Sequence, residues 1–210
     1  MFLRSCLVVA GLCVCGLAAA GEPQVLVRGT GMHGIHGIAA GPDGKLYVGS
    51  VVGQSIYRVD PQSGAIELWQ GPPQGMADDL VFGPDGRLVW TSFIFGQVHA
   101  RKGDGPVQEL ATGLPGINSL AFASDGRLFA TQVFLGDALH EIDPTGEKPA
   151  RKIMEGMGGL NGFQFGPDGK IYGPIWFGQK AARVDVDKAT IETVAEGFTV
   201  PAAANFGPDG

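Results

Sequence analysis

The sequence predicts an all-β protein, a β-propeller with four complete four-stranded blades and the start of a fifth. Three observations predict this fold: a tetrapeptide recurs every 40 to 43 residues, apolar columns recur with it, and each repeat carries the same series of turns. A period of about 40–50 residues is typical of propeller blades. The 35 glycines and 14 prolines supply turns, while 44% hydrophobic and 17% charged residues favour a packed core over disorder.

The repeated tetrapeptide is Gly-Pro-Asp-Gly, replaced by Ala-Ser-Asp-Gly in the third repeat. Its aspartates are Asp43, Asp85, Asp125, Asp168 and Asp209. Apolar residues stand five and three positions before each of them, and apolar and polar residues alternate again after the tetrapeptide. Because proline presets φ and glycine accepts the left-handed conformation, each tetrapeptide predicts a hairpin turn. We interpret the aspartates as turn residues rather than catalytic residues.

Two further strands per repeat complete each blade. Third strands are expected at 55–59, 98–101, 138–142 and 181–184, and the fourth strand of the first repeat at 65–69. The four complete repeats cover about residues 30–197, and the sequence ends inside the hairpin turn of a fifth repeat. We therefore expect the chain to be part of a longer propeller of six blades.

The first 20 residues predict a secretory signal peptide, and residues 21–210 the propeller domain. Arg4 precedes an apolar run from Cys6 to Leu17, and Ala18-Ala19-Ala20 forms a cleavage site. All three cysteines lie in this segment, so the mature protein would have neither disulfides nor thiolate chemistry. We expect an exported protein, periplasmic or secreted, with no membrane attachment after cleavage.

The net charge of the sequence indicates which classes of partner to expect. Fifteen Lys and Arg against 21 Asp and Glu give a net charge of −6, and no basic run is present. This composition lacks the basic surface that nucleic acids require, so we expect no nucleic-acid partner. Nucleophile-elbow, zinc-protease, phosphate-loop and dinucleotide motifs are also missing from the sequence. The expected partner is a small-molecule substrate or ligand.

A polar residue opens the innermost strand of four consecutive repeats, seven positions before each turn aspartate. These residues, which we call the ring, are His36, Asp78, Asn118 and Asn161. Innermost strands line the axis of a propeller, so we expect the four side chains to converge in one channel. Imidazole, carboxylate and amide oxygens can bind a divalent cation or a polar substrate. They can equally cap strands or hold channel water, and this alternative stays open.

The blade repeat, together with Leu160-Asn161-Gly162 at a strand opening, resembles the gluconolactonase, senescence-marker-protein and luciferin-regenerating-enzyme family over about residues 30–210. The resemblance implies a six-bladed propeller with one axial divalent cation, commonly calcium or zinc, that hydrolyses a sugar lactone. It implies that Asn161 is a metal ligand and that Asn118 contacts substrate. His36 stands where the family has a glutamate, and Ala202 where it has the aspartate proposed as general base.

These observations give one set of site predictions. One divalent ion is expected on His36, Asp78 and Asn161, and because imidazole suits borderline metals, zinc or manganese should compete with calcium. Asp78 or His36 is the expected general base, and Asn118 and His33 are expected to contact substrate. Asp79 should point to the other side of its strand as a solvated acid.

Apolar and aromatic residues in the second loop of each repeat should surround the ring, at 51–53, 93–96, 134–136 and 176–178. An apolar wall around a polar floor is typical of a small-molecule pocket. We therefore predict an exported metal-dependent hydrolase that acts on a lactone or related small ester. The alternative is a non-catalytic exported propeller that binds a small ligand or a protein partner at the channel face.

Overall fold

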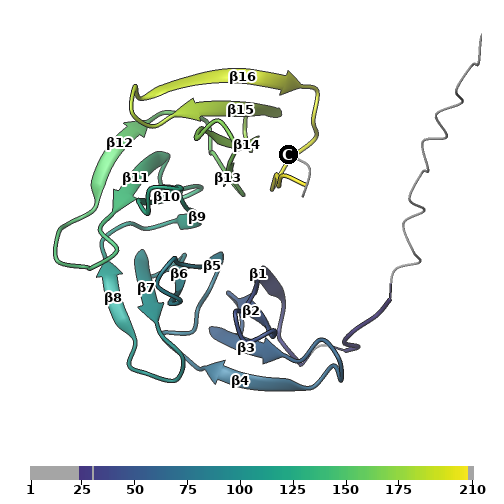
Figure 1. The fold of residues 1–210 in the computed structure, drawn as a ribbon. Coiled ribbons are helices and arrows are strands. Elements are labelled where there is room, and N and C mark those ends of the chain that lie inside the picture. Colours follow the sequence, from purple (N-terminus) through teal and green to yellow (C-terminus); the bar gives the residue numbers. More distant parts are fainter. Residues whose placement is uncertain (1–23, 30, 208–210) are drawn as a thin grey trace, which may run out of the picture.

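Four antiparallel sheets of four strands each stand side by side around an arc (Figure 1). This computed structural model describes residues 24–29 and 31–207. The expected signal peptide, and Asp209 of the fifth turn, lie outside the described residues. Within the described part of the chain there is no helix of the length and apolar character that a membrane span needs. The four-stranded blades that the sequence predicts are confirmed.

Each blade runs from an inner strand at the axis to an outer strand at the rim of the arc. Blade 1 consists of β1 (Ile35–Ala40), β2 (Leu46–Ser50), β3 (Ser55–Val59) and β4 (Ile66–Gln70). Blade 2 consists of β5 (Leu80–Phe82), β6 (Leu88–Ser92), β7 (Gln97–Arg101) and β8 (Gln108–Ala111). Blade 3 consists of β9 (Ile117–Phe122), β10 (Leu128–Gln132), β11 (Ala138–Ile142) and β12 (Arg151–Glu155). Blade 4 consists of β13 (Gln164–Phe165), β14 (Ile171–Ile175), β15 (Lys180–Asp185) and β16 (Thr190–Glu196).

The repeated tetrapeptide forms the hairpin between the first and second strand of every blade. In each described turn the aspartate Oδ1 accepts the backbone N–H two residues later, at 3.0–3.2 Å. The glycine that follows has φ between +72° and +88°, a conformation that disfavours side chains. The interpretation of these aspartates as turn residues is confirmed for Asp43, Asp85, Asp125 and Asp168.

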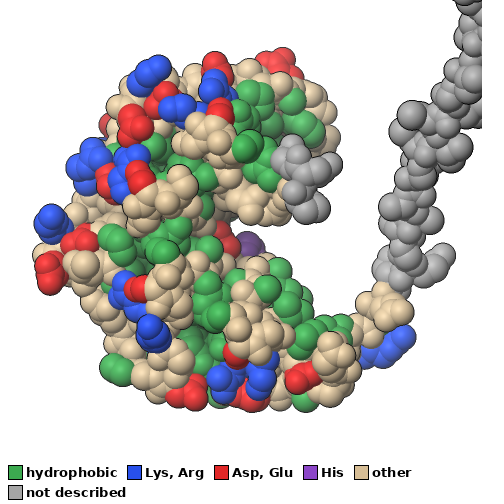
Figure 2. Space-filling view, in the orientation of Figure 1, with side chains coloured by type: hydrophobic (Ala, Val, Ile, Leu, Met, Phe, Trp, Pro, Cys, Tyr) green, Lys and Arg blue, Asp and Glu red, His purple; other side chains and the backbone are tan. Residues whose placement is uncertain are grey.

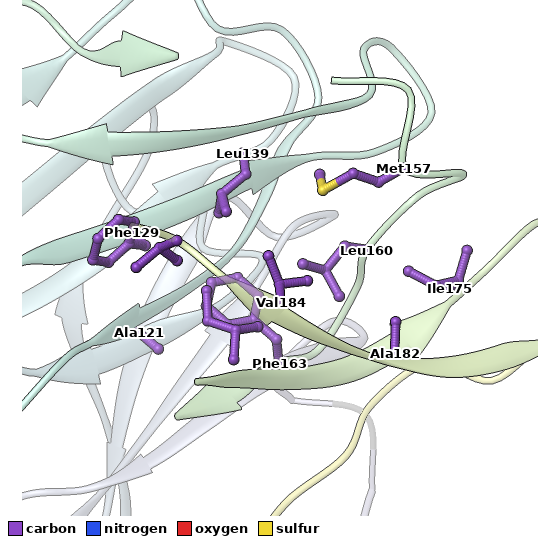
Figure 3. Packing of buried hydrophobic residues seen from close by; sticks show 11 residues of the cluster. Ala121, Phe129, Leu139, Met157, Leu160, Phe163, Ile175, Ala182 and Val184 are labelled. Atoms are coloured by element: carbon purple, nitrogen blue, oxygen red, sulfur yellow. The ribbon is translucent and has the colours of Figure 1, made fainter. Parts of the chain in front are cut away.

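The hydrophobic core lies between neighbouring blades rather than inside them. Ala121, Phe129 and Leu139 of blade 3 face Phe163 and Val184 of blade 4 (Figure 3). Similar clusters join blade 1 to blade 2 and blade 2 to blade 3. Burial of these apolar side chains stabilises the arrangement at about 25 cal/mol per Å². This packing holds the inner strands of adjacent blades side by side, and with them the residues that open those strands.

The chain after blade 4 lies along the inner strand of that blade. Ala204 donates its backbone N–H to Gly162 at 2.8 Å, and the Phe206 ring contacts Tyr172 edge-on with centroids 5.3 Å apart. No strand is formed over the described residues 201–207, where the repeat predicts one. The arc remains open between this segment and β1, and the space-filling view shows the same open outline (Figure 2).

Candidate functional site: the axial ring

The structure brings the four ring residues together at the inner edge of the blades. His36 lies in β1 and Asn118 in β9, while Asp78 and Asn161 lie just before β5 and β13. His36 Nδ1 is 2.6 Å from Asp78 Oδ1, and Asn118 Nδ2 donates to Asp78 Oδ2. The shared offset from the turn aspartates therefore places these side chains at one level.

A serine that the sequence analysis did not single out joins the two asparagines. Ser119 Oγ is 2.8 Å from Asn118 Oδ1 and 3.1 Å from Asn161 Oδ1, and it accepts the N–H of Gly162 at 2.7 Å. The Ser119 hydroxyl has one proton, which these two oxygens share, and the contacts connect His36 to Asn161 across four blades. The residues that directly follow the four ring residues are Gly37, Asp79, Ser119 and Gly162. Ser119 has the single hydroxyl among them, and this was the signal in the sequence that could have identified it.

Exposure divides the ring into two parts. Asp78, Asn118, Ser119 and Asn161 are buried, at 2–8% exposed, whereas 59% of the His36 side chain is exposed. The hydrogen bond to Asp78 raises the pKa of His36 above its ordinary value of 6.5, an effect that burial opposes only in part. The ring therefore presents one accessible imidazole, held from behind by a buried carboxylate.

Asp79 lies behind the ring and corrects the expectation of a solvated acid. Its Oδ1 accepts the N–H of Leu80 at 2.8 Å and its Oδ2 that of Leu120 at 3.0 Å, so the carboxylate is hydrogen-bonded within the protein. This carboxylate links blade 2 to blade 3. Desolvation raises the pKa of Asp79 to about 6, although the two backbone hydrogen bonds act in the opposite direction. One of its two N–H partners, that of Leu120, belongs to the next blade, and the sequence alone does not place it there.

His33 is not brought into the ring. Its side chain is exposed, its backbone has φ +50°, and its carbonyl oxygen accepts a hydrogen bond from Ser50 Oγ at 2.8 Å. Among the described residues no hydrogen bond joins it to a ring side chain. Its expected role in substrate binding stays a prediction. His99 and His140 are buried in the third strands β7 and β11, away from the inner edge.

The ring side chains are held by hydrogen bonds to one another. Over residues 24–29 and 31–207, no three His, Cys, Asp or Glu side chains are grouped as a metal site needs. Both Asp78 oxygens and the Asn161 oxygen already have protein partners, and His36 Nδ1 is bound to Asp78. Calcium prefers six to eight oxygen ligands, and zinc about four nitrogen, sulfur or oxygen ligands. A cation on His36, Asp78 and Asn161 would replace these hydrogen bonds, and the expected divalent ion stays a prediction.

Comparison with known proteins establishes the fold. No protein-family model matches the chain, and no curated protein matches its sequence. Among solved structures, virginiamycin B lyase from Staphylococcus aureus is 20% identical over 79% of this chain and 57% of its own, with a TM-score of 0.66. A streptogramin B lyase is 21% identical over 84% and 60%, with a TM-score of 0.68. The chain has the fold of the β-propellers.

A putative gluconolactonase is also similar, at 14% identity over 84% of this chain and 67% of its own, with a TM-score of 0.67. The fold is thus shared with propellers that include lyases and a putative gluconolactonase. At 14–21% identity these likenesses concern the fold alone. The chain spans 57–60% of the length of the two lyases.

Proposed function

We propose that the protein is an exported hydrolase of a lactone or related small ester, with His36 as general base and Asp78 as its partner. The 2.6 Å contact between His36 Nδ1 and Asp78 Oδ1 carries the proposal. An exposed imidazole against a buried carboxylate is a geometry suited to proton transfer. The predicted signal peptide supports export, and the acidic sequence without a basic run favours a small-molecule substrate.

The reaction follows from the orientation of the imidazole. Asp78 accepts the proton on Nδ1, which leaves the lone pair of the neutral ring on Nε2. Nε2 takes a proton from water as the water oxygen forms a bond to the substrate carbonyl carbon. The Asp78 carboxylate stabilises the imidazolium, and Asn118 holds that carboxylate through Oδ2. The carbon–oxygen bond to the alcohol then breaks, and the imidazolium returns its proton to the departing alkoxide.

This proposal needs no cation, although the resemblance implies one. No step above passes through a metal. Chelation therefore separates this proposal from a metal-dependent one. Treatment with EDTA should leave the turnover of the purified chain unchanged, and loss of turnover that zinc, manganese or calcium restores would contradict this part of the proposal.

The substitution Asp78→Asn tests the dyad most strongly. It preserves shape but removes the charge and the preference for a proton on Nδ1, so turnover of a lactone panel should fall about 10²–10⁴-fold. Asp125→Asn is the matched control, because Asp125 serves an exposed turn. Folding of both variants is checked by circular dichroism.

Two results would favour the alternative of a non-catalytic binding propeller. One is an Asp78→Asn variant as active as the parent. The other is a folded parent that turns over no lactone or ester in the panel. Mass spectrometry of the product distinguishes hydrolysis, which adds the elements of water, from elimination, which adds nothing.

A further inference from the structure

We propose that an aromatic rim beside the ring binds an aromatic group of the substrate, so that the lactone or ester is aryl-bearing rather than a polyhydroxylated sugar lactone. The rim consists of Phe93, Phe134, Trp176 and Phe177. That the reacting group is a lactone or ester rests on the proposed function. That the substrate carries an aromatic group rests on the rim residues alone.

The rim lies at the end of the blades where the ring residues open their strands. Its residues belong to the loops that join the second and third strands of blades 2, 3 and 4. In blade 3, Gln132 at the end of β10 pairs with Ile117 at the start of β9, and Val133 donates its N–H to Gly116 at 2.8 Å. In blade 4, Trp176 donates its N–H to Gly159 at the same distance. Gly116 and Gly159 each stand two residues before a ring asparagine.

Glycine at these two positions lets the rim loops lie against the strand openings. A Cβ atom on Gly159 would lie 3.0 Å from Cδ2 of Phe177, and one on Gly116 would lie 2.9 Å from Cβ of Leu135. A side chain at either position would require the neighbouring loop to shift. The rim is therefore in direct contact with the backbone that positions Asn118 and Asn161.

One phenylalanine is the centre of the rim. The ring of Phe134 meets those of Phe93, Trp176 and Phe177 edge-on, with centroids 6.2, 5.2 and 5.7 Å apart. Edge-on pairs are favoured for aromatic rings, and these pairs join loops of three blades. Phe134 also has φ +70°, a strained conformation for a side chain of this size. Such strain persists where the surroundings fix the residue, and it is frequent at ligand sites.

The rim remains accessible although its rings pack together. Phe134 is 48% exposed and Phe177 62% exposed, and Leu135 beside them is 57% exposed. A contiguous exposed apolar surface next to a polar site is typical of a ligand-binding surface.

The chemistry of the rim decides the class of substrate. The loop tips contain only apolar side chains, in the segments 93–95, 134–135 and 176–177. The hydroxyl groups of a sugar lactone would find a single side-chain donor there, the indole N–H of Trp176, and no side-chain acceptor, and leaving buried polar groups unpaired is unfavourable. A flat aromatic group would instead extend the edge-on packing around Phe134.

Binding of stable lactams tests this inference without any turnover. The two probes are hydrocarbostyril, an aromatic lactam, and gluconolactam, a sugar lactam, each titrated into the chain by calorimetry. Trp176 is half-buried, whereas Trp69 and Trp90 are 7% and 0% exposed, so changes in tryptophan emission report on the rim. We expect saturable binding of hydrocarbostyril with a change in emission, and binding of gluconolactam at least about tenfold weaker.

Variants locate the binding. Phe134→Ala and Phe177→Ala should each weaken hydrocarbostyril binding roughly tenfold. Leu68→Ala, at a 60% exposed residue of outer strand β4, should leave it unchanged. Equal affinity for the two lactams, no saturable binding of either, or unchanged affinity in both phenylalanine variants would overturn the inference. So would a dimer in sedimentation experiments that Phe177→Ala dissociates, because the rim would then be an interface between copies.

The two proposals fail in different ways. If hydrocarbostyril binds at the rim but the chain hydrolyses no aromatic or aliphatic lactone, the proposed hydrolase is wrong and the aromatic rim stands. If the chain hydrolyses gluconolactone as well as dihydrocoumarin and hydrocarbostyril does not bind, the hydrolase stands and the rim proposal is wrong.

Discussion

Two columns of polar residues recur in every blade, and they differ in where their hydrogen bonds go. The turn aspartates bond to the N–H two residues later within their own hairpin, at 3.0–3.2 Å. The ring residues and the neighbouring Ser119 bond across blades, as His36 does to Asp78, Asn118 to Asp78, and Ser119 to Asn161. Partners in the ring are 40–42 residues apart in the sequence.

This difference explains why one column repeats and the other varies. A turn makes the same demand in every blade, so the same aspartate and glycine meet it four times. The ring joins neighbouring blades, so the residue in one blade must complement the residue in the next. Imidazole pairs with carboxylate, carboxylate with amide, and amide with hydroxyl. Substitutions in the ring should therefore alter activity, and substitutions in the turns should alter local stability alone.

Ser119→Ala should have the largest effect of the three substitutions considered next. The variant removes the hydroxyl that holds the Asn118 amide, so the carboxylate of Asp78 loses a fixed partner. Small misplacements of catalytic groups are costly, and turnover should fall about tenfold to a hundredfold. The matched control is Ser92→Ala, a buried serine whose Oγ has no hydrogen-bond partner among the described residues. Equal turnover in both variants would show that the chain of hydrogen bonds is not needed.

Asp79→Asn tests the link between blades 2 and 3. The asparagine side chain has one oxygen, so it cannot accept both backbone N–H groups as the two carboxylate oxygens do. The free energy of unfolding should therefore fall by about 1–3 kcal/mol. The folded-state pKa of Asp79 is raised to about 6, above its unfolded value of 3.8. Its contribution is therefore largest below the unfolded pKa and is lost as pH rises through about 6.

The pH dependence of the unfolding free energy provides a control for the Asp79→Asn measurement. Urea unfolding of parent and variant at about pH 4 and about pH 7 should show that the parent gains stability relative to the variant at the lower pH. The charge of Asp79 is the last and smallest of the causes that raise the pKa of His36, so both proteins are compared in a His36→Gln background, which removes this contribution. A difference in unfolding free energy that is the same at both pH values would contradict the account of Asp79.

Asp85→Ala should have the smallest effect. The aspartate accepts the Arg87 N–H at 3.0 Å within one exposed hairpin, and its side chain is 48% exposed. Unfolding free energy should fall by about 0.5–1 kcal/mol, with turnover unchanged. A turnover loss comparable with that of Ser119→Ala would remove the distinction between the two columns.

The sequence predicted the elements governed by local chemistry. Proline, aspartate and glycine at fixed offsets specify a hairpin without reference to the rest of the chain, so the period predicted the blades and the level of the ring. It could not predict Ser119 as a bridge or Asp79 as a clamp, because their partners are supplied by a neighbouring blade. The role of His33 in substrate binding stays a prediction, because a spacing of three from His36 does not specify where the loop places its side chain.

Titration of His36 tests the central claim most directly. Nuclear magnetic resonance resolves the ring protons of the four histidines, and His36 is assigned from a His36→Gln variant. The account predicts a midpoint for His36 above 6.5 in the parent, because the hydrogen bond to Asp78 favours the imidazolium. In Asp78→Asn that midpoint should move down to 6.5 or below. A parent His36 that titrates at or below 6.5, or a midpoint unmoved by Asp78→Asn, would contradict the dyad.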